Sequence, residues 1–322
     1  MELLNMLSEY EYVSGEKLAA ALGVSRAAVH KQIARLRRAG YAVTAEKNRG
    51  YLLQRRPDRL TPAEIRRFLH AEHPWAAHIH CLASVDSTQA VAKQRATGGD
   101  PEGTLVLAEE QTAGYGRLQR RWVSSPGGLW LSLILRPALR PDAVAQLTLV
   151  CSLAMARAIE RVCRVSLRIK WPNDLLAPGT DSRPRKIAGM LTEMSAEIDR
   201  VAWVVIGVGV NVNNAVRGVE GGQAVSLATL TGDTVDRARL LSAFLLDFEE
   251  DYRRFCRAGF APFAAAYNER AMLGGKQVDI DIGGRVLRGR VDAIDGDGFL
   301  QLRQPDGSVE RVIAGTVDRI YE

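Results

Sequence analysis

The chain has 322 residues, of which 47% are hydrophobic and 25% charged, and these proportions exclude a disordered or fibrous protein. No apolar run approaches the roughly 18 residues that cross a bilayer, and the N-terminus lacks a signal-peptide pattern, so we expect no membrane span. The net charge of +6 is uneven: residues 1–56 hold ten of the 43 Lys and Arg but only five of the 37 Asp and Glu, a balance typical of a nucleic-acid-binding module.

The first predicted elements are two helices joined by a sharp turn. Gly15–Leu22 forms the first helix and Arg26–Arg38 the second, with Ser25 as the N-cap of the second. The second helix has an apolar stripe at i, i+4 and i+7, formed by Val29, Ile33 and Leu36. This pattern predicts a helix-turn-helix, whose second helix enters the major groove of DNA.

Two short strand-like runs, at 43–45 and 50–53, predict a hairpin whose tip lies against the DNA backbone as a wing. Residues 1–56 are therefore a predicted winged helix-turn-helix domain. The candidate DNA-binding residues are, for base edges, Arg26 and His30 with Ser25 beside them, and, for phosphates, Lys31, Arg35, Lys47 and Arg49. The alternative is a small helical protein-interaction domain with a solvated basic face.

A polar, proline-containing segment at 54–59 predicts a linker to a second domain. Thr61-Pro62-Ala63-Glu64 has the pattern of a capping box with proline at the first helical position, so a helix begins there. Strand-like runs then occur at 78–83, 104–108, 129–135, 167–171, 187–194 and 201–210, and helical patterns at 88–95, 144–162 and 237–255. Strands and helices mixed at this scale predict a sheet domain with both kinds of element.

Polar residues gather at the ends of these strands. They form four groups, in chain order: Ser87, Thr88 and Gln89; Lys170 and Asp174; Lys186 and Gly189; Gly207 and Asn211. The hydroxyl groups after the first strand hold a polar ligand or simply cap the next helix. The lysines suit a phosphate and the aspartate suits a cation, whereas the G-x-G pattern of the last group is weak by itself.

The loop at residues 111–122 combines glycines and arginines. Gln111 opens it, and its chemical residues are Gly114, Gly116, Arg117, Arg120, Arg121 and Trp122. Glycine allows backbone N–H groups to approach an anion, and arginine adds fixed donors suited to phosphate or carboxylate. Taken alone, the loop is either an anion-binding lid or a solvated basic turn, and Trp122 either supports it or belongs to the core.

The C-terminal part of the chain alternates apolar and polar residues in short runs, at 278–282, 285–294, 299–303 and 309–313. Gly-Gly, Asp-Gly-Asp-Gly and Pro-Asp-Gly turns separate them. This meander predicts a small SH3-like β-barrel over residues 273–322.

The four cysteines are scattered along the chain without a C-x-x-C pair: Cys81, Cys151, Cys163 and Cys256. They predict free thiols in a reducing cytoplasm, and neither a disulfide framework nor a structural zinc site.

Five motifs in order resemble those of the biotin–protein ligases. They are D-S-T at 86–88, the Gly/Arg loop at 111–122, K-W-P-N-D at 170–174, R-K-x-A-G at 185–189 and G-x-G-x-N at 207–211. With the basic helix-turn-helix in front, the chain is similar to the bifunctional bacterial form, a biotin ligase and biotin-operon repressor in one polypeptide. The resemblance covers essentially the whole chain. It implies an α+β protein with a winged helix-turn-helix, a mixed-sheet, class II synthetase-like catalytic domain at 61–272 and the SH3-like C-terminal domain.

The resemblance implies a two-step ligation that depends on ATP and Mg²⁺. Biotin and ATP form biotinyl-5′-AMP, and biotin is then transferred to a lysine of the biotin carboxyl-carrier protein of acetyl-CoA carboxylase. Biotinyl-5′-AMP is also the implied corepressor, acting on a homodimer that binds the biotin-operon operator.

The resemblance also implies roles for residues of this chain. The implied catalytic residues are Lys186, Arg117, Asp174 and Lys170, with magnesium near Asp174. The implied biotin-binding residues are Ser87, Thr88, Gln89, Gln111, Tyr115, Gly116, Arg117, Lys186, Gly189, Gly207 and Val210. The implied residues of the adenylate loop and its surroundings are Gly114, Tyr115, Gly116, Arg117, Arg120, Arg121, Trp122 and Asn211.

The loop departs from the family pattern G-R-G-R-x-G-R at two positions. Tyr115 stands in place of an arginine, which removes one cation, and Gln119 stands in place of a glycine and resists positive φ. Both changes bear on how tightly biotinyl-5′-AMP is held and on how its binding is coupled to dimerisation. Stacking of Tyr115 on the ligand, or a nearby cation such as Arg121, would offset the lost charge.

Three other functions fit parts of the sequence. A lipoate-type acyl-protein ligase would share the central fold, but a DNA-binding domain in front argues against it. A ligand-sensing transcription factor with weakened ligase activity would keep the wing, and the altered loop is compatible with it. A ligase for another small carboxylic acid is the third.

Overall fold

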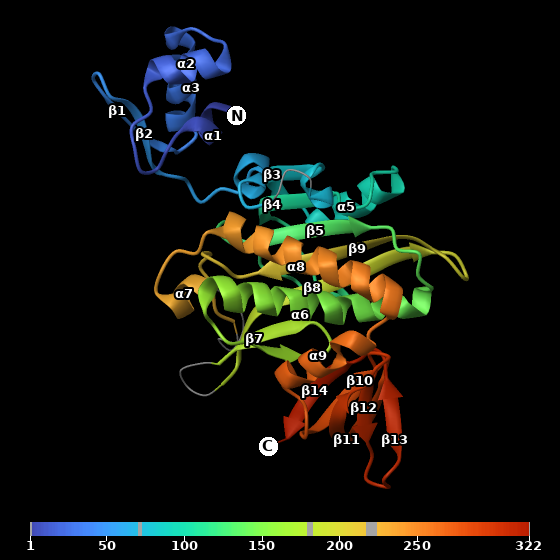
Figure 1. Ribbon diagram of the computed structural model, residues 1–322. Helices are drawn as coiled ribbons and strands as arrows, with labels where there is room; N and C mark the ends of the chain where they lie inside the picture. Colours follow the sequence, from blue (N-terminus) through green and yellow to red (C-terminus); the bar gives the residue numbers. More distant parts are fainter. Residues whose placement is uncertain (1, 70–72, 179–182, 217–223, 322) are drawn as a thin grey trace. The chain divides into compact units, whose positions relative to one another are not determined.

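The chain folds as two compact units, residues 1–59 and 60–322, each with its own hydrophobic core (Figure 1). The computed structural model describes residues 2–69, 73–178, 183–216 and 224–321.

The first unit is a small helical domain with a β-hairpin. Its elements are α1 (Glu2–Met6), α2 (Gly15–Leu22), α3 (Arg26–Arg38), β1 (Ala42–Glu46) and β2 (Gly50–Arg55). The hydroxyl of Ser25 caps α3 by accepting the Ala28 N–H at 3.2 Å. Leu18, Val29 and Ile33 fill the core between the helices. The predicted helix-turn-helix and hairpin are thus confirmed.

The second unit is built on a seven-stranded mixed sheet in the order β3-β4-β5-β9-β8-β7-β6. Its strands are β3 (Ile79–Val85), β4 (Leu105–Gln111), β5 (Leu129–Leu135), β6 (Arg168–Lys170), β7 (Asp174–Ala177), β8 (Arg185–Ala196) and β9 (Val201–Val210). β3 and β4 are parallel and the other neighbours are antiparallel. β5 is buried at every position, which is why it is a continuous apolar run in the sequence.

Helices cover both faces of this sheet. They are α4 (Pro62–Arg66), α5 (Thr88–Thr97), α6 (Val144–Cys163), α7 (Leu227–Thr231), α8 (Arg237–Ala258) and α9 (Ala264–Arg270). α6 and α8 pack side by side along one face (Figure 1). Because strand side chains alternate between faces, Val106, Ile134 and Val205 pack with α5 instead.

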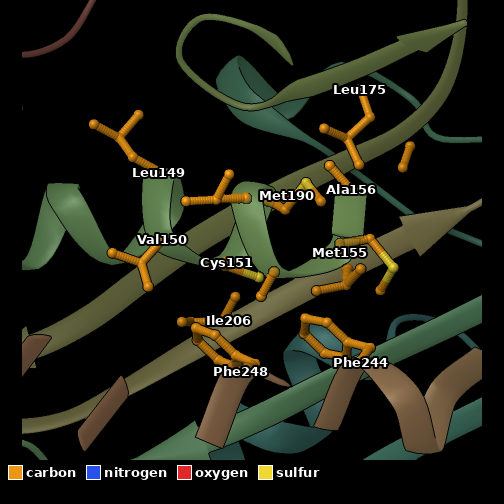
Figure 2. Close-up of a cluster of buried hydrophobic side chains, with 14 of the residues drawn as sticks. Leu149, Val150, Cys151, Met155, Ala156, Leu175, Met190, Ile206, Phe244 and Phe248 are labelled. Atoms are coloured by element: carbon orange, nitrogen blue, oxygen red, sulfur yellow. The ribbon is translucent and has the colours of Figure 1, made fainter. Parts of the chain in front are cut away.

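The core between the sheet, α6 and α8 is dense and apolar. Cys151 and Met155 of α6 lie among Ile206 of β9 and the stacked rings of Phe244 and Phe248, whose centroids are 5.3 Å apart (Figure 2). Within the described residues, one helix, at 141–163, is long and apolar enough to cross a membrane, an apolar stretch longer than we expected. Of that stretch, 67% is buried, as in the core helix of a globular unit.

The C-terminal segment forms an antiparallel sheet in the order β13-β12-β11-β10-β14. Its strands are β10 (Gln277–Ile282), β11 (Arg285–Ile294), β12 (Leu300–Arg303), β13 (Val309–Val312) and β14 (Thr316–Tyr321). The four predicted strands are present. β14, which we did not predict, pairs with β10 and forms one edge of the sheet.

The start of the second unit is tied to β4, the strand next to the edge strand β3. The N–H of Leu60 donates to Glu109 Oε1 on β4 at 3.1 Å. The other oxygen of Glu109 accepts from Arg237 Nη1 at 2.8 Å, and the Arg237 side chain is only 2% exposed. A buried arginine therefore holds the carboxylate that receives the linker.

Candidate active site

A cavity of about 850 Å³ lies at the ends of the central strands, within the size range of small-molecule sites. Nearly all the predicted site residues line this cavity. They come from the loop at 111–122 and from motifs before and after it in the sequence: Ser87, Thr88, Gln89, Gln111, Tyr115, Gly116, Arg117, Arg120, Arg121, Trp122, Lys170, Asp174, Lys186, Gly189, Gly207 and Asn211.

Two predicted residues do not line this cavity. Val210 is fully buried in the core, whereas its neighbours Gly207, Val208 and Gly209 on β9 line the cavity. Gly114 lies behind the wall, where a Cβ would come within 2.8 Å of the Trp122 carbonyl oxygen, so only glycine fits there.

One end of the cavity is polar and uncharged. Gln111 Oε1 accepts from both the N–H and the hydroxyl of Thr88, at 2.8 and 3.0 Å. Its Nε2 donates to the hydroxyl of Ser124 at 2.7 Å. These contacts fix the orientation of the Gln111 amide, so this end presents donors and acceptors in set positions.

A buried serine that sequence analysis missed completes this polar end. The Ser132 hydroxyl lies 3.0 Å from Thr88 Oγ1 and 2.9 Å from Gln89 Oε1. A Cβ at Gly207 would lie 2.6 Å from the same Gln89 oxygen, so this position of β9 needs glycine. One serine inside an apolar strand gives no signal in the sequence, and neither does Ser124 beyond the loop.

The cavity also holds an ion pair. Lys186 Nζ lies 2.7 Å from Asp174 Oδ1, and both side chains are partly buried. Antiparallel pairing of β7 with β8, which sets Asp174 opposite Gly189, brings these two motifs together. Lys186 Nζ also lies 4.9 Å from the centroid of Trp122, whose ring meets Trp130 edge-on at 6.4 Å. Trp122 therefore supports the site by packing.

The loop at 111–122 folds as an irregular hairpin beside the cavity. The Gly116 N–H donates to the Arg120 carbonyl at 2.8 Å, and the Trp122 N–H to the Gly114 carbonyl at 2.9 Å. Between them, Leu118 and Gln119 both have left-handed backbones, with φ of 55° and 56°. Left-handed backbone costs a non-glycine residue roughly 1–2 kcal/mol. Gln119 therefore adopts the conformation that glycine would supply at less cost.

Arg117 reaches from the loop to the C-terminal sheet. Its Nη2 donates to the carbonyl of Gly315 at 2.8 Å, and its Nη1 to Asn173 Oδ1 at 3.4 Å. Burial lowers the pKa of Arg117, an effect that the charge of Asp174 opposes. A buried guanidinium bonded to a neutral carbonyl is well placed to exchange that partner for an anion.

The charged lining of the cavity is mostly positive. Among the described residues it comprises five cations, Arg117, Arg120, Arg121, Lys170 and Lys186, and one carboxylate, that of Asp174. A partly enclosed basic cavity of this kind favours anionic ligands. In the described part of the chain, no group of three or more His, Cys, Asp or Glu side chains forms a metal site.

The basic face of the first unit is separate in sequence from this cavity. Arg26, His30, Lys31 and Arg35 are exposed on α3. Arg37 on the same helix is engaged, since its Nε donates to the Val43 carbonyl at 2.8 Å. The predicted DNA contacts on α3 are therefore all accessible to solvent on one helix.

The wing carries the other two predicted phosphate contacts. Lys47 is exposed at its tip. Arg49 pairs with Glu46 at 2.8 Å and lies 4.2 Å from the ring centroid of Tyr12. Arg49 is thus held against the hairpin, and its charge is partly offset there.

The cysteines are free thiols, as expected. Burial raises the pKa of Cys81 to about 12 and of Cys163 to about 11, and it also raises those of Cys151 and Cys256. These thiols therefore stay protonated near neutral pH and are poor nucleophiles.

Three family descriptions match successive parts of the chain. Residues 1–52 match an HTH domain, residues 81–211 the biotin/lipoate A/B protein ligase family, and residues 273–319 the biotin protein ligase C-terminal domain.

Relatives align with the chain over almost its full length. It is 37% identical to the bifunctional ligase/repressor BirA of Bacillus subtilis, over 98% of this chain and 97% of that protein. It is 31% identical to the BirA protein of Escherichia coli, over 98% and 96%. Among solved structures, the biotin protein ligase of Aquifex aeolicus in complex with biotin and ATP superposes with a TM-score of 0.65 at 27% identity, covering 76% of this chain and all of that one.

Proposed function

Since the chain belongs to the bifunctional biotin–protein ligase and repressor family, we propose that it activates biotin with ATP, transfers it to a carrier protein and represses transcription. The observation that carries the ligase proposal is that one cavity is lined both by a neutral hydrogen-bonded group around Gln111 and Thr88 and by a group of cations with one carboxylate. A ureido ring suits the first, and a carboxylate beside a triphosphate suits the second.

The first step joins two anions that repel each other. The biotin carboxylate attacks the α-phosphorus of ATP, an acyl–phosphate bond forms, and pyrophosphate leaves. Arg117 and Lys186 stabilise the charge on the carboxylate and the α-phosphoryl oxygens, and Lys170 binds the phosphates. Their contacts to the Gly315 carbonyl and to Asp174 are those that the ligand replaces.

The neutral end holds the ureido ring. Ser87, Thr88, Gln89 and Gln111 supply donors and acceptors that Ser124 and Ser132 keep oriented. Gly189 and Gly207 leave room for the ligand beside β8 and β9. Gly116 and Asn211 border the nucleotide, with Arg120 and Arg121 beside its phosphates.

In the second step, the amine of a carrier lysine attacks the acyl carbon of biotinyl-5′-AMP. An amide forms, AMP leaves, and the amine loses a proton. A biotin carboxyl-carrier protein is the partner that this chemistry requires. Asp174 is the carboxylate nearest to the reacting groups, and it suits either the incoming ammonium or magnesium.

Magnesium fits this site as a companion of ATP. Asp174 offers one carboxylate, and Mg²⁺ in nucleotide sites commonly uses one or two carboxylates together with phosphate oxygens. Its Oδ1 is buried and, among the residues that the structure describes, its partner is the ammonium of Lys186 at 2.7 Å. Bound there, the ion would neutralise phosphate charge.

The ligase proposal is tested by incubating the full chain with ATP, biotin and an apo carrier protein, with lipoate in place of biotin as a parallel reaction. We expect biotinylation of one carrier lysine, release of AMP and pyrophosphate, and little lipoylation. Absence of biotin transfer would refute the proposal. Transfer of lipoate alone would indicate the lipoate-type activity.

The repressor proposal rests on the exposed basic residues of α3 and on the wing. A homodimer bound to an operator with two half-sites suits a helix-turn-helix protein. We expect binding to the promoter of the biotin operon that biotin and ATP together strengthen. Arg35→Ala should reduce the slope of log affinity against log salt by about one, because one phosphate contact is lost.

Arg140→Ala is the matched control for Arg35→Ala, since it removes an exposed arginine from the second unit. It should leave the salt slope unchanged. DNA binding that ignored both biotin and ATP would contradict the corepressor role. We further propose a cytoplasmic location and domain limits at 1–56, 61–272 and 273–322.

A further inference from the structure

Tyr115, which stands where the family pattern has arginine, makes a contact that an arginine-based ligand site would not need. Its hydroxyl donates to Glu193 Oε2 on β8 at 3.1 Å. The other oxygen of Glu193 pairs with Lys93 Nζ on α5 at 2.8 Å, and Lys93 Nζ lies 5.7 Å from the centroid of the Tyr115 ring. One loop side chain thus reaches both a strand and a helix of the scaffold.

The remaining anchors of the loop differ in kind. Its base is held by backbone bonds, from the Thr112 N–H to the Val85 carbonyl and from the Ala113 N–H to the Asp86 carbonyl, both at 2.9 Å. Farther along, Arg117 donates to the Gly315 carbonyl, but an anionic ligand would replace that carbonyl and remove this anchor. The phenol of Tyr115 anchors the middle of the loop by a contact that a bound anion leaves in place, while the packing of Trp122 holds the end of the loop.

The charges around the contact are balanced. A bare carboxylate 3.1 Å from a residue lining an anion-binding cavity would repel the ligand, and the ammonium of Lys93 offsets the charge of Glu193. Burial raises the pKa of Tyr115, so its hydroxyl remains a donor throughout the neutral range.

We propose that Tyr115 is a positioning residue that keeps the loop at 112–122 folded beside the cavity before any ligand binds. Glu193 is its acceptor, and Lys93 neutralises that acceptor. The loop is then ordered when the protein folds. The binding free energy of the ligand is therefore not reduced by the full entropic cost of ordering the loop. Retention of biotinyl-5′-AMP therefore relies on a pre-folded loop in place of a fourth loop cation beside Arg117, Arg120 and Arg121.

The test compares Tyr115→Phe, Glu193→Ala and the double variant with the native full chain. Hydrogen exchange of the amides at 113–121 is measured first, without ligand. Loss of one hydrogen bond to a charged group should speed exchange about tenfold in each single variant. Because both substitutions break the same contact, the double variant should exchange no faster than Tyr115→Phe alone.

The matched control is Tyr252→Phe, which removes another phenol–carboxylate bond, from Tyr252 to Glu102 Oε2 at 2.7 Å, outside the cavity. It should leave exchange in the loop unchanged. Native exchange rates in Tyr115→Phe, or additive effects in the double variant, would overturn the proposal.

The second measurement separates positioning from general stability, and it rests on the ligase proposal. Tyr115→Phe should raise KM for biotin about tenfold and speed release of preformed biotinyl-5′-AMP, with a much smaller change in kcat. A fall in kcat of about tenfold with an unchanged KM for biotin would contradict the positioning role. Exchange in the ligand-free loop is measured without turnover, so failure of the ligase proposal would leave that result standing.

Discussion

Two cations of the cavity, Lys186 and Arg117, have different neighbours, and this decides how each meets a ligand. Lys186 is paired with a carboxylate, whereas Arg117 is bonded to a neutral carbonyl. An anion must compete with Asp174 for Lys186, but it displaces only a carbonyl from Arg117. Arg117 is therefore the cation that captures an anionic ligand more readily, and Lys186 moves onto it once two negative groups share the site.

Lys186→Ala should lower the rate of biotin-dependent ATP–pyrophosphate exchange about 100- to 1,000-fold, because one preorganised charge at the reacting oxygens is lost. Lys186→Arg keeps the charge and should retain part of the rate. Lys276→Ala, which removes an exposed lysine before β10, is the control and should exchange at the native rate. Near-native exchange in Lys186→Ala would remove this lysine from the chemical step.

Gly209 on β9 provides the seat for Trp122. A Cβ there would lie 2.6 Å from Trp122 Nε1, so Gly209→Ala should push the indole, and with it the end of the loop, away from the sheet. Overpacking of this size costs about 1–3 kcal/mol, so KM for biotin should rise at least about fivefold. Gly274→Ala, whose Cβ would meet no atom within 4 Å, should behave as native. An unshifted Trp122 fluorescence in Gly209→Ala would show that the indole had not moved.

At the scale of elements, the C-terminal sheet is held by one carboxylate shared among three strands. Asp279 of β10 accepts from Arg288 of β11 at 2.8 and 3.1 Å and from the hydroxyl of Tyr321 on β14 at 2.8 Å. These hydrogen bonds, first from Arg288 and then from Tyr321, hold the pKa of Asp279 down to about 2. The β14 strand that sequence analysis missed is thus fixed partly by charge.

This depressed pKa predicts an acid-sensitive step. The stabilisation is present above the unfolded-state pKa of about 4 and is lost as pH falls toward 2, because the unfolded chain binds the proton first. The urea midpoint of unfolding of the second unit should therefore fall between pH 4 and 2, and Asp279→Asn should lack that part of the fall. Asp281→Asn on the same strand, which alters a turn contact to Gly284, is the control. An identical acid profile in Asp279→Asn would contradict this assignment.

At the scale of the whole molecule, two separate cores divide the work. The first unit packs around Leu18, Val29 and Ile33, and the second around α6, α8 and the sheet. The basic excess belongs to the first unit and the ligand cavity to the second. DNA affinity should thus depend steeply on salt, while biotin activation should not.

A chain that begins at residue 56 should keep ligation and lose operator binding. The second unit retains its whole core and all described lining residues, so its kcat should stay within about threefold of native, with a Tm shift smaller than about 2 °C, equivalent to about 1 kcal/mol or less. Both are measurable against the full chain in one preparation. Loss of the cooperative unfolding transition would show that the second unit depends on the first for its fold.

The sequence predicted those parts of the fold that depend on local periodicity. β5 and β9, α2 and α3 have the predicted bounds, because apolar runs and caps set them locally. β7 was hidden in a turn motif, since only its pairing with β6 and β8 makes it a strand. The polar network at Ser124 and Ser132 was missed because three-dimensional proximity alone gives these serines a partner in the site.

The bond from Leu60 to Glu109 also limits how far the chain can be shortened from its N-terminus. A chain started beyond Leu60 would leave Glu109 Oε1 without its donor while Arg237 stays buried against the other oxygen. Glu109 and Gln111 are two residues apart on β4, so they point to the same side of one strand. A truncation that removes the DNA-binding unit together with Leu60 therefore disturbs the strand that carries Gln111, the amide proposed to bind biotin. Its first effect should be weaker binding of biotin.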